Sequence, residues 1–143
     1  MEHYAFVLIV NEKYWNQIRR ASNQNFSTHA FVRKNKVGPK QTQKLLFYVT
    51  KKKQVLGSAD FIERQSGNGE ELWKKFGNET CFESFDEYKK FADQRETMTF
   101  IRFSNFTELT SPLSKEGIGE VLGSMQGFGA GKYVDKDTAT KLV

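Results

Sequence analysis

The sequence predicts an α+β protein in which a curved mixed β-sheet or small barrel is decorated by short helices. Strand patterns recur along the whole chain, most clearly at residues 4–10, 44–50 and 97–103, and short helical patterns lie between them. The 143 residues contain no internal repeat and no linker. We therefore expect a single domain spanning residues 1–143, an ordinary size for one hydrophobic core.

The first third of the chain predicts a strand, a helix and a second strand. Tyr4–Val10 is a continuous apolar run, which is typical of a strand buried on both faces. Asn11 is a candidate N-cap for a helix that continues to about Ala21, since its side-chain oxygen can accept from an unpaired amide of the first turn. Thr28–Arg33 has strand character and leads into a basic loop over residues 34–40.

The next segment predicts a β-hairpin. Lys44–Thr50 is the clearest strand pattern, Lys51–Lys53 is its turn, and Gln54–Glu63 is the returning partner. Gly57 within that partner indicates a β-bulge or a close approach of the backbone to another element.

Weaker patterns cover the second half of the chain. A capping box formed by Ser84 and Glu87 predicts the start of one helix. The expected helices are 70–76, 84–92, 114–122 and 135–142, the expected strands are 97–103 and 106–109, and 126–131 is a glycine-rich loop.

Composition excludes several classes of protein and site. No stretch approaches the roughly 18 apolar residues that a membrane span requires, and the N-terminus lacks the pattern of a signal peptide. Cys81 is the single cysteine, which excludes an internal disulfide and a thiolate metal site. His3 and His29 are far apart and lack carboxylate pairs at ligand-like spacing. We expect a cytoplasmic protein with no metal, cofactor or membrane partner.

Two superficially catalytic features do not predict an enzyme. The segment Gly127–Lys132 resembles a phosphate-binding loop, but Gln126 stands where its first glycine is required and Tyr133 where a hydroxyl would hold magnesium. These glycines more simply permit positive φ angles in a tight turn, or a close backbone approach. Cys81 lies beside Glu79 and Glu83, whose charges raise the pKa of a thiol and disfavour a nucleophile.

Charge is distributed unevenly along the chain. Residues 1–59 contain eleven Lys and Arg against two Asp and Glu, a balance of +9, whereas residues 60–143 contain eleven against fifteen, a balance of −4. This asymmetry indicates a surface that faces a polyanion on one side of a single fold. A run such as Lys51–Lys53 also has a simpler explanation, because lysines commonly solvate exposed turns.

Aromatic and basic side chains alternate in the first third, on segments that we expect to be neighbours in the sheet. Cations attract phosphates, and a ring on which a base stacks contributes roughly 1–3 kcal/mol per base. A pocket closed by Trp15 or Phe31 would hold an everted base, with Asn11 hydrogen-bonding its edge. The alternative is that both rings belong to the core. The predicted nucleic-acid site comprises Asn11, Trp15, His29, Phe31, Arg33, Lys34, Lys36, Tyr48 and Lys51.

The same segments resemble the EVE-domain proteins, a branch of the PUA-like superfamily. The resemblance rests on Val10–Trp15 with Ile18-Arg19-Arg20, on the basic stretch Phe31–Lys36, and on the strand, turn and Gly-containing strand from Lys44 to Gly57. It covers about residues 4–63 well and the rest of the chain in outline.

This resemblance implies a PUA-like mixed β pseudo-barrel without catalytic activity. Such domains bind RNA, or DNA bearing a modified base, in a pocket beside a basic surface. By position, the resemblance implies that Asn11 and Trp15 belong to the pocket and that Arg33, Lys34, Lys36 and Lys51 contact phosphates.

Two segments depart from the family's pattern. The Gly-Asp turn before the central strand is replaced by Gln43-Lys44, and the small or Trp-rich segment before the basic stretch is Thr28–Phe31. These differences fit an archaeal offshoot of the PUA-like group better than a typical EVE protein.

Two other functions stay open at this point. An RNA- or nucleotide-processing enzyme would need a titratable group at the pocket floor, for which His29 is the candidate. A protein–protein adaptor would use the acidic second half of the chain. The sequence does not fix the oligomeric state.

Overall fold

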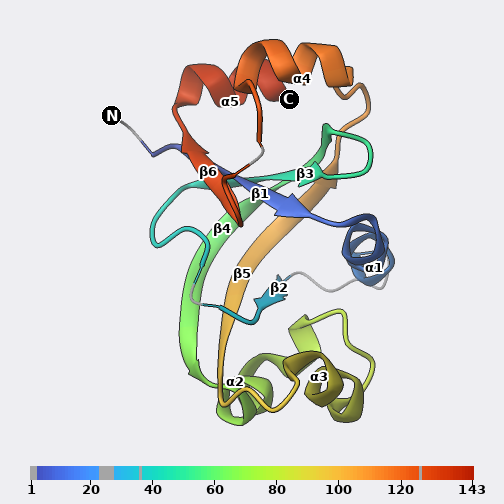
Figure 1. Ribbon diagram of the computed structural model, residues 1–143, viewed down its shortest axis with the longest axis vertical. Helices are drawn as coiled ribbons and strands as arrows, with labels where there is room; N and C mark the ends of the chain where they lie inside the picture. The colour runs from blue at the N-terminus through green and yellow to red at the C-terminus, as the bar shows by residue number, and fades with distance from the viewer. Residues whose placement is uncertain (1–2, 23–27, 36, 126) are drawn as a thin grey trace.

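The computed structural model shows a strongly curved β-sheet with helices at both ends and along one side (Figure 1). It describes residues 3–22, 28–35, 37–125 and 127–143. The elements in chain order are β1 (Ala5–Val10), α1 (Glu12–Ser22), β2 (Thr28–Arg33), β3 (Lys44–Val49), β4 (Gln54–Asn68), α2 (Gly69–Phe76), the 3₁₀ turn η1 (Gly77–Glu79), α3 (Phe85–Ala92), β5 (Thr97–Glu108), α4 (Lys115–Leu122), β6 (Gly131–Val134) and α5 (Lys136–Leu142).

The sheet has mixed topology. Within the described residues six strands pair in the order β2-β5-β4-β3-β1-β6. β1 and β3 are parallel, and the other neighbouring pairs are antiparallel. A parallel pair needs a long crossover, and here the chain makes it through α1, β2 and the basic loop. The predicted α+β class is therefore confirmed.

β1 is buried on both faces, as its continuous apolar sequence predicts. Successive side chains of a strand point to opposite faces of the sheet. Phe6, Leu8 and Val10 accordingly enter the core beneath α1. Ala5 and Val7 enter a second core beneath α4 and α5.

Three groups of helices cover the sheet through their apolar faces. α1 contributes Trp15 and Ile18 to the core that contains Phe47. α4 and α5 close one end of the sheet, and α2 and α3 close the other, where Leu72 and Tyr88 pack on the far ends of β2 and β5 (Figure 1). The predicted start of α3 is confirmed, because Ser84 accepts from the amide of Glu87. The Glu87 carboxylate accepts from the amide of Glu83, one residue before the amide that a capping box uses.

Gly57 lies at a β-bulge and at a close approach between the backbone and another element, the two alternatives that the sequence predicts. The β3–β4 register shifts next to it, between Phe47 and Tyr48, as a bulge requires. A Cβ atom at Gly57 would also lie 2.7 Å from the ring of Trp15. Glycine is therefore needed where the α1 side chain crosses the strand.

The strands differ from their predicted bounds in three places. β4 continues beyond Glu63 to Asn68, and β5 is one strand where two were expected, with Asn105 in a left-handed conformation. β6 was not predicted; it pairs with β1 antiparallel, directly after the glycine-rich loop. In each case the segment is a strand because it pairs with a neighbouring strand, and its local sequence alone does not specify that structure.

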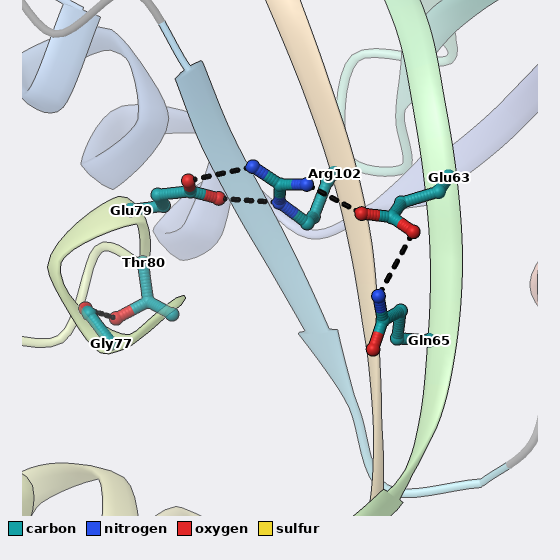
Figure 2. Close-up of polar contacts among 6 residues, drawn as sticks. All are labelled: Glu63, Gln65, Gly77, Glu79, Thr80 and Arg102. Atoms are coloured by element: carbon teal, nitrogen blue, oxygen red, sulfur yellow. Dashed lines mark hydrogen bonds and ion pairs between the residues drawn. The ribbon is translucent and has the colours of Figure 1, made fainter. Parts of the chain in front are cut away.

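Arg102 on β5 connects the sheet to η1, the turn between α2 and α3, at the end of the sheet that these two helices cover (Figure 2). Its guanidinium contacts both oxygens of Glu79 in η1, at 2.8 and 2.9 Å, and Glu63 on β4 at 2.5 Å. The ring of Phe76 lies 4.3 Å from its central carbon. A hydrogen bond from Gln65, together with the contacts from Arg102, lowers the pKa of Glu63. One cation on β5 thus joins two segments that approach it from opposite sides.

No helix among the described residues is long and apolar enough to cross a membrane. Those residues also contain no group of three or more His, Cys, Asp or Glu side chains arranged to hold a metal ion.

Replacing Arg102 with alanine should destabilise the fold. Glu79 is only 17% exposed and would lose its bidentate partner. We expect urea denaturation to show that the free energy of unfolding falls by about 3 kcal/mol, because removing one member of a largely buried ion pair leaves the other charge without a partner. The control is Lys74→Ala, an exposed position on α2, and a loss for Arg102→Ala no larger than this control would contradict the role of the ion pair.

Tyr88 should make the protein less stable at high pH. Burial raises the pKa of its phenol from 10.0 to about 12. Above pH 10 the unfolded chain releases this proton and the folded chain keeps it, so stability should fall as the pH rises from about 10 to about 12. Tyr88→Phe should flatten this fall, although loss of the 2.8 Å hydrogen bond to the Gly69 carbonyl lowers stability at neutral pH. Equal slopes for both proteins in urea denaturation at several pH values would contradict the expectation.

Candidate nucleic-acid interface

A pocket of about 390 Å³ lies where α1, β2, α3 and the loop before β6 meet. We call it the Arg33 pocket. Its lining includes Tyr14, Phe31, Arg33, Lys34, Phe91 and the backbone of Gly129-Ala130. Aromatic rings, two cations and loop backbone are thus gathered from four segments that are distant in sequence.

Local structure fixes the side chains of this pocket. The Asn11 carboxamide accepts from the amide of Tyr14 at 2.8 Å, which begins α1 and sets the position of Tyr14. Phe31 and Arg33 are two residues apart on β2 and therefore share one face of the sheet. Tyr14 meets Phe31 and Phe91 edge to face, with ring centroids 6.0 and 5.7 Å apart.

The electrostatics of the pocket are unusual at Arg33. Its Nε is buried and has no hydrogen-bond partner among the described residues, and burial lowers the pKa of the guanidinium. An arginine nevertheless keeps its charge at neutral pH. The group lies over the Phe31 ring at 5.3 Å, and the Lys34 ammonium lies 5.0 Å from the Phe91 ring. The pocket therefore presents positive charge to any ligand that enters it.

A second pocket, of about 400 Å³, lies between the β3–β4 hairpin and α4. We call it the Tyr48 pocket. Its polar lining comes from Tyr48, Lys53, Lys115 and Ser124. Burial raises the pKa of the Tyr48 phenol, which therefore stays protonated at neutral pH. Within the described residues no carboxylate forms an ion pair with Lys53 or Lys115.

A known family matches most of the chain. The domain of unknown function DUF365 matches residues 8–135. The chain belongs to the DUF365 family. No curated protein matches the sequence of this DUF365 protein.

Solved structures of an ASCH protein from Zymomonas mobilis are similar to this DUF365 protein along nearly its whole length. The crystal structure of that protein gives a TM-score of 0.76 at 18% identity, covering 98% of this chain and 94% of the other. A Ser-to-Ala mutant gives 0.72 at 18%, covering 97% and 94%, and a Tyr-to-Phe mutant gives 0.75 at 17%, covering 96% and 94%. At this identity the likeness establishes the fold, and it confirms the predicted PUA-like architecture.

Three predicted site residues meet in one place in the DUF365 structure. Phe31, Arg33 and Lys34 all line the Arg33 pocket. Tyr48 lies instead in the second pocket, with lysines that the prediction did not include. The predicted residues Phe31, Arg33 and Lys34 thus lie in a different pocket from Tyr48.

Trp15 and His29 lie largely in the interior, and Trp15 also lines a separate pocket of about 350 Å³ together with Arg19 and Lys52. Trp15 is 3% exposed and packs on Phe47 and Phe106 at 6.0 and 5.5 Å between ring centroids. His29 is 4% exposed and stacks on Phe103 at 5.6 Å. Both side chains pack against aromatic rings of the sheet, and their predicted contact with a base stays a prediction.

The remaining predicted residues have different surroundings. The Asn11 side-chain oxygen caps α1, and the predicted contact of Asn11 with a base stays a prediction. Lys51 lies at the exposed hairpin tip, with its ammonium 4.0 Å from Glu12. Lys36 lies outside the described residues.

Sequence reasoning missed Tyr14, Phe91 and the Gly129-Ala130 backbone as pocket residues. Tyr14 lies on α1 and Phe91 lies on α3. Their rings line the same pocket because α1 and α3 are in contact, and no local sequence pattern predicts that contact. A usable signal was Asn11, because the cap fixes which helical residues follow it on each face.

Proposed function

We propose that this DUF365 protein is a non-catalytic module that binds single-stranded RNA, or DNA bearing a modified base, by holding an unpaired base in the Arg33 pocket. The observation that carries the proposal is the Arg33 guanidinium, which lines a pocket of aromatic rings and forms no ion pair with a carboxylate among the described residues. A guanidinium presents five N–H donors in a planar fork, which can hydrogen-bond an acceptor on a ligand in that pocket. A base edge or a phosphate oxygen supplies such an acceptor.

The dimensions and lining of the pocket suit a nucleobase. Ligand pockets commonly measure about 300–1,000 Å³, and the Arg33 pocket falls within that range at about 390 Å³. The rings of Tyr14 and Phe91 offer flat apolar surfaces, which stack on any base. The resemblance to EVE-domain proteins supports a modified base as the ligand, and the basic character of residues 1–59 supports contacts to phosphates.

The test is binding of a fluorescein-labelled single-stranded RNA, followed by anisotropy at two salt concentrations. Arg33→Gln should weaken binding at least tenfold, because a hydrogen bond from a charged donor contributes about 1.5–3 kcal/mol. Lys34→Gln should weaken all sequences alike and reduce the slope of log affinity against log salt by about 1. Lys75→Gln is the matched control, since it removes the same charge at an exposed position of α2.

Two results would overturn this proposal. One is that the wild-type protein binds neither single-stranded RNA nor modified single-stranded DNA. The other is that Arg33→Gln, with an unchanged circular dichroism spectrum, binds as tightly as Lys75→Gln.

We propose RNA processing at the Tyr48 pocket as a second candidate function. In RNA cleavage the 2′-oxygen forms a bond to phosphorus and releases its proton to solvent water, while the bond from phosphorus to the 5′-oxygen breaks and that oxygen takes up a proton. Positive charge stabilises the phosphorane between these two events. The protonated Tyr48 phenol supplies such a proton, and Lys53 and Lys115 supply the charge. A phenol and a hydroxyl, as on Tyr48 and Ser124, are also the groups removed in the two mutants of the Zymomonas mobilis ASCH protein.

This candidate predicts shortened products when end-labelled single-stranded RNA is incubated with the protein. Tyr48→Phe and Lys53→Ala should each lower the rate at least tenfold, since a positioned acid typically contributes about 10²–10⁴-fold. DNA of the same sequence should stay intact because it lacks the attacking 2′-hydroxyl. Equal rates for Tyr48→Phe and the wild-type protein, or no products at all, would eliminate this candidate.

A further inference from the structure

The glycine-rich loop before β6 exposes an aromatic ring that neither pocket accounts for. Phe128 is 46% exposed. Among the described residues, the other large apolar residues that are exposed are Ile62 and Val143. A single exposed apolar side chain is common on protein surfaces, so the exposure of Phe128 gains its meaning from the groups around the ring.

The loop holds Phe128 in a defined position although it is rich in glycine. The amide of Gly131 donates to the Phe128 carbonyl at 3.1 Å and closes a turn. The amide of Ile9 in β1 donates to the Ala130 carbonyl at 2.8 Å. Gly131 itself, at φ 145°, lies so close to β1 that a Cβ atom would be 1.9 Å from the Val7 carbonyl oxygen. The sheet edge therefore anchors the base of the loop.

The position of Phe128 relates it to the Arg33 pocket. The two residues that follow it, Gly129 and Ala130, line that pocket. The Lys132 ammonium lies 4.7 Å from the Phe128 ring centroid and donates to the Leu122 carbonyl at 2.7 Å. The Phe128 ring thus lies against Lys132 near the end of α4, and the next two residues of the chain line the pocket that contains Arg33 and Lys34.

We propose that Phe128 is a second stacking platform, so that the protein holds two successive bases of a single strand, one in the Arg33 pocket and the next on the Phe128 ring. This inference rests on the proposed function and specifies its ligand. The Lys132 ammonium, which has further protons to donate, faces the phosphate beside the stacked base. The ligand class is single-stranded oligonucleotides of two or more residues, because bases paired in a duplex have no free face to offer.

The test compares a mononucleotide with a six-nucleotide single-stranded RNA, measured by calorimetry on the full chain. Phe128→Ala should weaken the hexamer by about tenfold, because base–aromatic stacking is lost, and should leave the mononucleotide unchanged. Phe128→Trp should restore hexamer binding. Phe128→Leu is the matched control, since it keeps an apolar side chain but removes the ring, and it should behave like Phe128→Ala.

The outcomes separate this inference from the proposed function. If Arg33→Gln weakens the hexamer and Phe128→Ala does not, the stacking platform is overturned and the pocket stands. Full affinity of Phe128→Leu, or equal weakening of mononucleotide and hexamer by Phe128→Ala, would also overturn it. If the wild-type protein binds neither ligand, the proposed function itself fails. Urea denaturation of each variant verifies that the fold is retained.

Discussion

The bend in the β4–β5 pair is the constraint on which the other elements depend. β3 pairs with β4 and β2 pairs with β5, so the shape of this central pair sets the position of both flanks. Its register shifts between Ser58 and Asp60 and between Phe61 and Glu63, and such irregularities bend and twist a strand. The resulting curvature is visible in Figure 1, and it lets α1, β2 and the loop before β6 converge on one pocket. Arg102 on β5 lies opposite Glu63 on β4 in the register of this bent pair. Its contacts with Glu79 connect η1, and with it the α2–α3 end, to the same pair of strands.

The sequence predicts the helices and strands that have strong local patterns. It does not predict the strands that form only because they pair with a neighbour. β1 and β3 follow from continuous apolar runs, and α3 follows from Ser84 and Glu87 because a cap is a local hydrogen bond. The end of β4 is polar from Arg64 to Asn68 and is a strand because β5 pairs with it. β6 is four residues long and begins with glycine, so its strand identity comes from β1. The places where the sheet bends and the order in which its strands pair depend on such distant contacts, which a single sequence does not display.

The candidate site was predictable to the same extent. The alternation of β2 places Phe31 and Arg33 on one face, and that relation is purely local. Trp15 and Tyr14 are neighbours on α1, but their rings point to different sides, one into the core and the other toward Phe91. Which of two adjacent rings is accessible depends on what covers the helix. Composition alone favours tryptophan as a stacking residue and cannot register that Phe47 and Phe106 already cover it.

Net charge indicated a polyanion-facing surface, but the pairing of individual charges locates it. Arg19 pairs with Glu108, Lys44 with Asp60, and Lys51 approaches Glu12, so these first-half cations already have carboxylate partners. Arg33 and Lys34 face aromatic rings, and no ion pair joins them to a carboxylate within the described residues. A cation over a ring keeps most of its hydrogen-bonding capacity, since the ring accepts none of its protons as strongly as an oxyanion does. Arg33 and Lys34 therefore remain available to a phosphate beside the aromatic pocket, and Lys53 remains available in the Tyr48 pocket.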